Sequence, residues 1–230
     1  MKTRCCQLGC VILFLVGTNA RCQNSPAVEA PPTNTPAYPK VNLAPWYEVD
    51  PAWPQRPPDV PWGQVPGIAV DKEDNIWAVD NGNHQVYKFT REGKLLQTWG
   101  IKGEIGTDDK TFNRPTDITF PPNGDFFVSD GYGNSRVVKF SKDGKYLKSW
   151  GKPGKGPSEF QTVHSIAIDS KQRIYASDRE NNRIQIFTSN GEFLKQWTHL
   201  GATQGLFITP KDEMWVITHR NNVENITYDT

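Results

Sequence analysis

Three side chains whose types can do chemistry lie in stretches that recur along the chain: Tyr132, His164 and Arg179. An imidazole accepts protons near neutral pH and is a common metal ligand, and a guanidinium binds a carboxylate through two parallel hydrogen bonds. A tyrosine acts as a base only where a nearby cation or metal lowers its pKa. These residue types together are suited to an anion- or peptide-binding pocket. Each also has a structural interpretation, as a packed loop tyrosine, a core histidine or a loop arginine.

Arg179 differs from the arginines that recur once in each repeat. Arg136 and Arg183 take the same position in successive repeats, which indicates a structural role, and we expect His84 to replace them in the first repeat. Arg179 has no such counterpart, so we expect it to serve a ligand. Aspartates also recur once per repeat, and we expect them to cap turns rather than to bind calcium: Asp71, Asp80, Asp130, Asp169 and Asp178.

These candidates must be positioned by a repeated unit of short strands. Similar stretches end at Phe89, Phe140 and Phe187, which are 51 and 47 residues apart, and each is followed by a Gly-containing turn and a strand that closes on a tryptophan. A period near 50 residues made of strands and turns is typical of β-propeller blades. By the repeat alignment the three candidates lie at the same end of their blades, where the loops of a propeller converge.

The second repeat shows the expected blade most clearly. Its strands are predicted at 117–120, 126–129, 136–140 and 146–150, with no helix signal. A fourth repeat begins near Gln204, so we expect three complete blades and one partial blade in an all-β fold. Closed propellers have about four to eight blades. We therefore expect a fragment of a longer propeller, or a chain that another copy completes.

The N-terminal residues resemble a processing signal. Lys2 and Arg4 precede an apolar run at 10–17, and residues 18–20 form a plausible cleavage site, so we predict a signal peptide over 1–20 and a secreted, extracytoplasmic protein. The apolar run is too short to span a bilayer. Cys22 is the one cysteine after this segment, and a lipid anchor there is an alternative that Arg21 disfavours.

Composition divides the rest of the chain in two. Residues 21–62 are rich in proline and form a leader that we expect to be partly disordered, with its aromatic residues packing on the propeller, which occupies 63–230: Trp46, Tyr47, Trp53 and Trp62. The chain has 26 basic and 25 acidic residues, and this balance argues against a nucleic-acid surface.

Particular motifs resemble a known family. The pattern D-x-x-x-N-x-R-[VI]-x-x-F at 130–140 and 178–187 looks like the NHL repeat. The stretches S-D-G-Y-G-N-S-R and V-H-S-I…S-D-R-E-N-N-R-I-Q closely resemble consecutive blades of the peptidyl-α-hydroxyglycine α-amidating lyases. The resemblance covers roughly residues 65–222. It implies an NHL-type six-bladed propeller, of which this chain contains about four blades.

The resemblance also implies a reaction. These lyases cleave the N–C bond of a C-terminal α-hydroxyglycine and release a peptide amide and glyoxylate. A zinc ion held by three histidines lies on the propeller axis, calcium binds near it, a tyrosine acts as a base and arginines hold the carboxylate. By resemblance, Tyr132 is this tyrosine, His164 is one zinc ligand and Arg179 is one of the arginines.

The chain departs from the family at several positions. Pro66 stands where the resemblance places another zinc ligand, and the third histidine belongs to a blade beyond the last residue of this chain. The family's cysteines are replaced in pairs, by Asn113 with Gly133 and by Tyr175 with Ile186.

Two further functions remain open beside a lyase. One is a non-catalytic propeller that binds a peptide, a small carboxylate or a protein partner through the same three residues. The other is a calcium-dependent lactonase, which needs acidic or amide ligands at the starts of the inner strands. That alternative ranks last because these positions hold Gly67, Asp117, Ser165 and Gly205.

Overall fold

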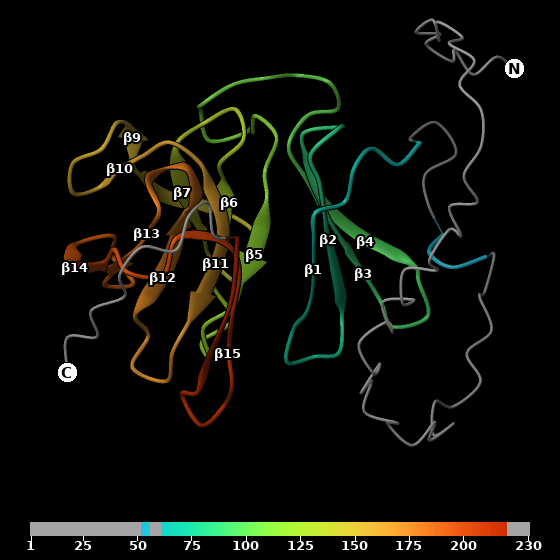
Figure 1. Cartoon of the computed structure of the whole chain (residues 1–230). Coiled ribbons are helices and arrows are strands. Elements are labelled where there is room, and N and C mark those ends of the chain that lie inside the picture. Colours follow the sequence, from blue (N-terminus) through green and yellow to red (C-terminus); the bar gives the residue numbers. More distant parts are fainter. Residues whose placement is uncertain (1–51, 56–60, 220–230) are drawn as a thin grey trace, which may run out of the picture. The chain divides into compact units, whose positions relative to one another are not determined.

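A computed structural model describes residues 52–55 and 61–219 (Figure 1). The predicted signal peptide, Cys22 and most of the leader lie outside the described residues. The described part of the chain consists of strands and a single 3-10 turn. It contains no helix that is long and apolar enough to cross a membrane.

Three four-stranded antiparallel sheets follow one another along the chain, each with its strands in sequence order. The first contains β1 (Gly67–Val70), β2 (Ile76–Asp80), β3 (Gln85–Phe89) and β4 (Leu95–Trp99). The second contains β5 (Asp117–Thr119), β6 (Phe126–Asp130), β7 (Arg136–Phe140) and β8 (Tyr146–Trp150). The third contains β11 (Val163–Ile168), β12 (Ile174–Asp178), β13 (Arg183–Phe187) and β14 (Phe193–Trp197). The prediction of three complete blades is confirmed.

The fourth sheet has two strands, β15 (Ala202–Ile208) and β16 (Met214–His219), which match the predicted partial blade. Two small elements were not predicted. A short parallel pair, β9 (Lys152–Pro153) with β10 (Glu159–Phe160), connects the second blade to the third, and the 3-10 turn η1 spans Arg179–Asn181.

The first strands of the four sheets lie side by side, β1 against β5, β5 against β11, and β11 against β15. Polar side chains join them. The Ser165 hydroxyl donates to the Asp117 carboxylate at 2.7 Å and accepts the Leu206 N–H at 3.0 Å. Sheets that are stacked through their first strands around a common axis form a β-propeller, which confirms the predicted all-β class.

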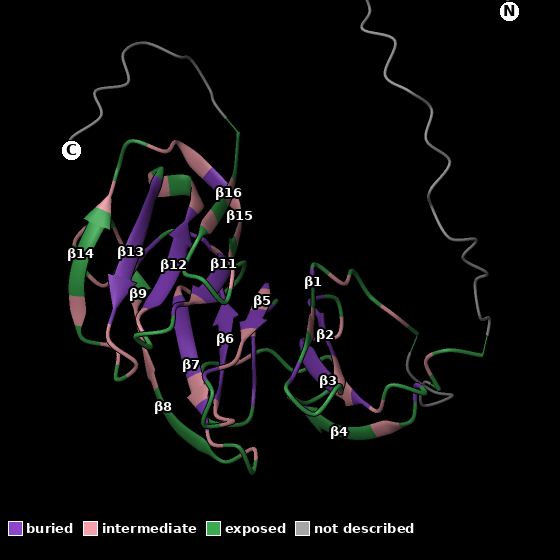
Figure 2. Cartoon of the chain, turned by 90° about the horizontal axis from the view of Figure 1, so that it is seen from below, coloured by how far each residue is buried: buried purple, intermediate pink, exposed green. Residues whose placement is uncertain are grey.

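The cores lie between neighbouring blades, where Figure 2 shows the strands as buried. Between the first and second blades, Trp77 stacks on Trp99 with ring centroids 4.8 Å apart, and Phe126 packs against Trp77 at 4.9 Å. Between the second and third, Phe127 and Phe160 are fully buried. Burial of each such side chain contributes about 1.5–3 kcal/mol, so each blade depends on its neighbours.

The hairpins between third and fourth strands explain the recurring glycines. Gly93, Gly144 and Gly191 have φ of 87°, 79° and 79°, and a bulge in each ladder accompanies them. A left-handed backbone at this place favours glycine, and it turns the chain back onto the sheet.

Aromatic residues of the leader pack on the first blade, as expected. The ring of Trp62 meets Tyr87 edge-on at 5.4 Å, and Trp53 lies 6.4 Å from Phe89. Trp46 and Tyr47 lie outside the described residues.

The once-per-blade aspartates do cap loops. Asp130 is fully buried and accepts hydrogen bonds from Asn134 at 2.7 Å and from Arg136 Nε at 2.9 Å. In the next blade, Asp178 takes the same role with Asn181 and with Arg183, both at 2.8 Å, in a loop that is one residue shorter. These contacts explain why Asp, Asn and Arg recur together.

The prediction that His84 takes the position of the recurring arginine was wrong. Strand register pairs Asp80 with Gln85, as it pairs Asp130 with Arg136, so Gln85 occupies the arginine position of the first blade. His84 precedes it in a left-handed conformation with φ of 60°, and its Nδ1 accepts the backbone N–H of Arg114 at 3.0 Å. Its role is structural, but it differs from the predicted one.

Candidate functional site

A close backbone contact positions the loop that carries Tyr132. A Cβ atom on Gly131 would collide with the carbonyl oxygen of Val163, so only glycine lets this loop lie against the start of β11. The Tyr132 N–H also donates to the carbonyl of Arg114 at 3.3 Å. Tyr132 is therefore held beside the first residues of the next blade, where His164 follows Val163.

Tyr132 and His164 form a hydrogen bond across the two blades. The Tyr132 Oη lies 2.9 Å from His164 Nε2, and their rings meet edge-on with centroids 5.5 Å apart. On its other side, His164 Nδ1 lies 2.6 Å from the carbonyl oxygen of Gln204. A carbonyl can only accept, so Nδ1 carries the proton. In the neutral ring Nε2 is then the acceptor, and the Tyr132 hydroxyl donates to it.

The surroundings favour the neutral form of His164. Burial lowers the pKa of His164 below its ordinary value of 6.5, and the charge of Arg179 acts in the same direction. The hydrogen bond with Gln204 and the charge of Glu180 oppose this shift without reversing it. At neutral pH, His164 therefore presents an unprotonated Nε2 toward Tyr132.

Two guanidinium groups lie near the phenol ring of Tyr132. The Cζ of Arg179 lies 5.5 Å from the ring centroid, and the Cζ of Arg114 lies 5.8 Å from it. Arg179 stands on the turn η1 and is paired through Nε with Glu180 Oε1 at 2.8 Å. Tyr132 itself is 37% exposed, so part of the residue is accessible from solvent. The structure thus brings the three predicted residues together and adds Arg114.

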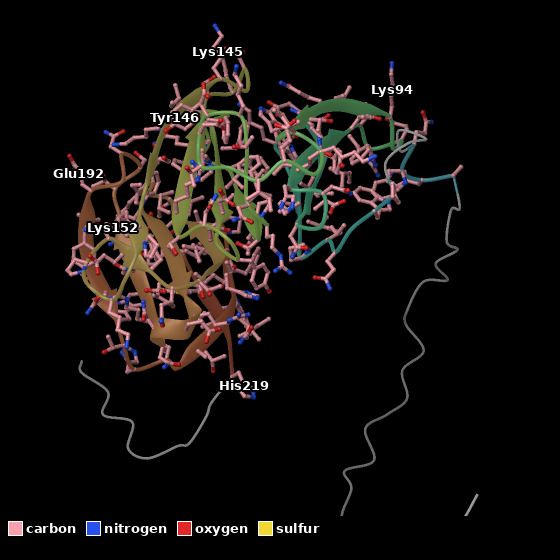
Figure 3. The ribbon with its side chains drawn as sticks, turned by 90° about the horizontal axis from the view of Figure 1, so that it is seen from above. Lys94, Lys145, Tyr146, Lys152, Glu192 and His219 are labelled. Atoms are coloured by element: carbon pink, nitrogen blue, oxygen red, sulfur yellow. The ribbon has the colours of Figure 1, made fainter. Side chains whose placement is uncertain are left out.

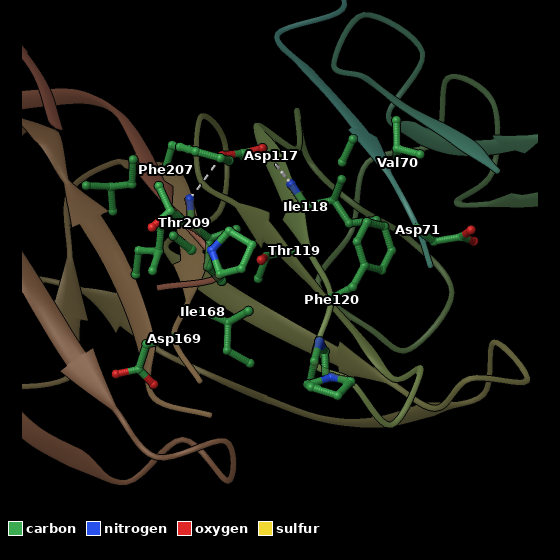
Figure 4. Close-up of a pocket in the computed structure, with 18 of the residues that line it drawn as sticks. Val70, Asp71, Asp117, Ile118, Thr119, Phe120, Ile168, Asp169, Phe207 and Thr209 are labelled. Atoms are coloured by element: carbon green, nitrogen blue, oxygen red, sulfur yellow. Dashed lines mark hydrogen bonds between the residues drawn. The ribbon is translucent and has the colours of Figure 1, made fainter. Parts of the chain in front are cut away.

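Two cavities follow the inner strands. The smaller, about 270 Å³, lies at the ends of these strands where His164 stands, and is also lined by Pro66 and Gln204. The larger, about 860 Å³, extends toward the opposite ends and is shown in Figure 4. Asp117 lines both, but its carboxylate already accepts bonds from the Ser165 hydroxyl and from backbone N–H groups. It therefore ties strands together, and it gives the lactonase alternative no set of ligands.

The donor atoms do not match the three-histidine zinc site that the resemblance implies. Of the four histidines in the sequence, His164 is the one that lines the smaller cavity, and Pro66 has no donor side chain there. His84 is buried and holds Arg114. Within the described residues, no group of three His, Cys, Asp or Glu side chains could hold a metal ion.

The positions of the replaced cysteines fit the alignment. The Gly133 N–H donates to the Asn113 carbonyl at 2.9 Å, and Tyr175 lies opposite Ile186 on neighbouring strands. Each pair is adjacent in the fold, so the alignment on which the site residues depend is consistent around the Tyr132 loop and in the third blade.

Sequence reasoning missed three parts of this arrangement. The Gln204 carbonyl that fixes the tautomer of His164 is a backbone atom and leaves no mark in a motif. The close approach of Gly131 depends on the spacing of two blades. Arg114 was detectable, because it follows the Phe112-Asn113 pair that aligns with the family.

A family model supports the architecture directly. The model described as a 6-bladed beta-propeller matches residues 106–220, which is half of the 230 residues. The chain belongs to the 6-bladed beta-propeller family. The match begins before β5 and reaches past the end of β16, so it contains Tyr132, His164 and Arg179.

Curated relatives of this propeller include amidating enzymes. The chain is 40% identical over 128 residues to mouse peptidyl-glycine alpha-amidating monooxygenase, covering 52% of this chain and 13% of that protein. It is 38% identical over 131 residues to Drosophila melanogaster peptidyl-alpha-hydroxyglycine alpha-amidating lyase 1, covering 52% and 24%. It is 35% identical over 122 residues to human NHL repeat-containing protein 3, covering 50% and 35%. The chain thus spans about a third or less of these relatives, and the resemblance to them is confirmed.

Solved structures agree on the fold. A streptogramin B lyase superposes with a TM-score of 0.50 at 22% identity, covering 65% of this chain and 46% of that one. The virginiamycin B lyase of Staphylococcus aureus, in a structure with quinupristin, superposes with a TM-score of 0.53 at 14% identity, covering 69% and 50%. At such identities the likeness extends to the propeller alone.

Proposed function

We propose that this propeller binds the α-hydroxyglycine end of a peptide and cleaves it to a peptide amide and glyoxylate, as the amidating lyases it resembles do. The observation that carries this proposal is the 2.9 Å hydrogen bond between Tyr132 Oη and His164 Nε2, with Nδ1 engaged by the Gln204 carbonyl. Because the Tyr132 hydroxyl donates to an oriented, neutral imidazole, it can give its own proton to His164 while it accepts a proton from the substrate.

The proposed step balances without a redox partner. Tyr132 Oη accepts the proton of the substrate's α-hydroxyl while its own proton moves to His164 Nε2. The O–H electron pair forms the C=O bond of glyoxylate, the C–N bond breaks, and its electrons go to the amide nitrogen. The proton then returns from His164 through Tyr132 to that nitrogen. Arg179, whose Cζ lies 5.5 Å from the centroid of the Tyr132 ring, holds the substrate carboxylate through its two terminal nitrogens.

In this proposal Tyr132 and His164 transfer the proton, and both belong to the described residues. The zinc and calcium that the resemblance implies belong to a family site with three histidines, of which the described residues supply His164, so we assign these ions no role here. The predicted signal peptide over 1–20 extends the proposal to an extracytoplasmic location, where secreted peptides are available as substrates.

A second candidate is binding without cleavage. The single imidazole at the smaller cavity and the two guanidinium groups beside Tyr132 favour it, because these groups can hold a peptide carboxylate without transferring a proton. Human NHL repeat-containing protein 3, at 35% identity, shows that the similarity extends beyond proteins named as lyases.

One assay separates the two candidates. The purified mature chain is incubated with an N-acyl-α-hydroxyglycine, and glyoxylate is measured with and without a chelator, alongside calorimetric binding of the corresponding N-acylglycine. Glyoxylate release that Tyr132→Phe and His164→Gln both abolish supports the lyase, and release that survives the chelator supports the metal-independent step. Binding without release supports the second candidate. Absence of both overturns the assignment of this site.

A further inference from the structure

We propose that Arg114 determines specificity at this site by binding a second anionic group of the ligand, and that it selects peptides with an acidic side chain directly before the C-terminal hydroxyglycine. The inference rests on the proposed function, because it assumes that Arg179 receives the terminal carboxylate. Arg114 was not among the residues that the sequence motifs indicated.

The backbone of Arg114 is fixed on both sides. Its N–H donates to the buried His84 Nδ1 at 3.0 Å, and its carbonyl accepts the Tyr132 N–H at 3.3 Å. The preceding residue, Asn113, donates its N–H to the buried Asp130 carboxylate at 2.9 Å. Contacts from the first blade and from the Tyr132 loop thus hold Arg114 in one place.

The conformation of Arg114 is unusual for its type. Its φ is 60°, in the left-handed region that long side chains rarely adopt. Such residues persist where surrounding contacts over-determine them, and they concentrate at ligand-binding places. Here the backbone contacts with His84 and Tyr132 hold Arg114 in this conformation. As a result, the side chain of Arg114 lies beside the Tyr132 ring.

The guanidinium of Arg114 is free to bind an anion. It lies 5.8 Å from the centroid of the Tyr132 ring in an exposed position, and no carboxylate of the described residues pairs with it. Arg179 differs, since Glu180 already neutralises part of its charge. Among the described residues, the site therefore has one guanidinium, that of Arg114, with no carboxylate partner.

This excess indicates two anionic groups on the ligand. The terminal nitrogens of Arg179 satisfy both oxygens of one carboxylate in the bidentate arrangement. The same carboxylate then leaves the charge of Arg114 without a partner, although Arg114 stands by the same ring. In a peptide bound at the Tyr132 hydroxyl, the residue before the hydroxyglycine lies within reach of Arg114. An aspartate or glutamate at that position would pair with Arg114.

Binding of matched peptides tests the inference. Three acylated peptides ending in glycine, with Glu, Gln or Lys before it, are titrated calorimetrically into the wild-type chain and into Arg114→Gln. We expect the Glu peptide to bind the wild-type chain about tenfold more tightly than the Gln peptide, the scale of one charge-assisted hydrogen-bonded pair, and the Lys peptide to bind least tightly. In Arg114→Gln the three dissociation constants should converge, while the affinity for the Gln peptide stays within about twofold.

Lys145→Gln is the matched control, because it also removes one positive charge. Lys145 is exposed in the hairpin at the opposite end of the same blade from Tyr132, and Figure 3 shows it at the periphery. This variant should keep the preference for Glu. Equal binding of the three peptides by the wild-type chain overturns the role of Arg114 and leaves the proposed function intact. An equal loss of affinity for all three in Arg114→Gln overturns it too, since Arg114 would then bind the terminal carboxylate. If none of the peptides binds, the result overturns the proposed function, and the role of Arg114 that rests on it is overturned as well.

Discussion

Arg179 begins the turn η1 and Arg183, four positions later, begins β13, and of the two only Arg183 is buried against Asp178. Arg183 Nε lies 2.8 Å from the Asp178 carboxylate, and its terminal nitrogens donate to backbone carbonyls of the segment 155–159. Arg179 points instead to the Tyr132 ring and keeps 21% of its side chain exposed. The same residue type therefore serves the fold at one position and is available to a ligand at the other.

Methionine substitutions should separate these two roles. Arg183→Met leaves a fully buried Asp178 carboxylate without its partner, so it should lower the free energy of unfolding by about 3–5 kcal/mol. Arg179→Met removes a partly exposed pair with Glu180 and should cost less than about 1 kcal/mol. Urea unfolding of both variants measures the difference, and equal losses of stability would contradict the assignment.

Glycine at position 131 should be essential to both the fold and the site. Gly131→Ala forces a methyl group against the Val163 carbonyl, so the loop must move away from β11, at a cost of about 1–3 kcal/mol and with loss of the Tyr132–His164 hydrogen bond. Gly205→Ala is the control, because a Cβ there meets Ile217 at an ordinary 3.4 Å. Thermal unfolding of the two variants tests this, and similar melting temperatures would refute the packing argument.

Asp71 should make the first blade sensitive to acid. Although its burial favours the neutral form, hydrogen bonds from Trp77, Asn75 and Lys88 lower the pKa of Asp71 from 3.8 to about 2. Because the folded pKa is the lower one, the stabilisation of about 2 kcal/mol is complete above pH 4 and is lost as pH falls toward 2. Urea unfolding at pH 5 and pH 2.5 measures this loss. In Asp71→Asn the contribution of this carboxylate should disappear, so the loss between the two pH values should be smaller than in the wild-type chain. An unchanged pH dependence in that variant would count against the assignment.

His164 should titrate below its ordinary pKa. Burial disfavours its charged form, so the folded protein takes up this proton at lower pH than the unfolded chain does. Stability should therefore decrease as pH falls below 6.5, and the Tyr132 hydroxyl should lose its acceptor in the same range. Proton NMR, with the His164 resonance assigned by its absence in His164→Gln, reports the midpoint directly. A midpoint above 6.5 would contradict the lowered pKa of His164.

The sequence was sufficient for the architecture because each blade repeats the same local rules. Turn glycines such as Gly144 and the pair of Asp130 with Arg136 act within one blade, and strand order follows from short hairpins. The candidate residues Tyr132 and Arg179 could also be predicted, because they lie in motifs that a family shares.

What the sequence did not predict depends on contacts between blades or on the register of strands within a blade. The proton on His164 Nδ1 is fixed by a backbone carbonyl from β15, and a carbonyl has no residue type to detect. His84 was assigned to the arginine position because the loops differ by one residue in length, and only strand register shows that Gln85 stands there. Arg114 reaches the site through a left-handed backbone that its own side chain does not favour.

The most direct test of the site is glyoxylate release from an N-acyl-α-hydroxyglycine at pH 7 by the wild-type chain and by Tyr132→Phe. The phenylalanine keeps the aromatic ring near Arg114 and Arg179 and removes only the hydroxyl that donates to His164. We predict that the wild-type chain releases glyoxylate and that Tyr132→Phe loses at least about a hundredfold in rate, the lower range for a lost general base. An equal rate in the two proteins would contradict proton transfer by Tyr132 and His164.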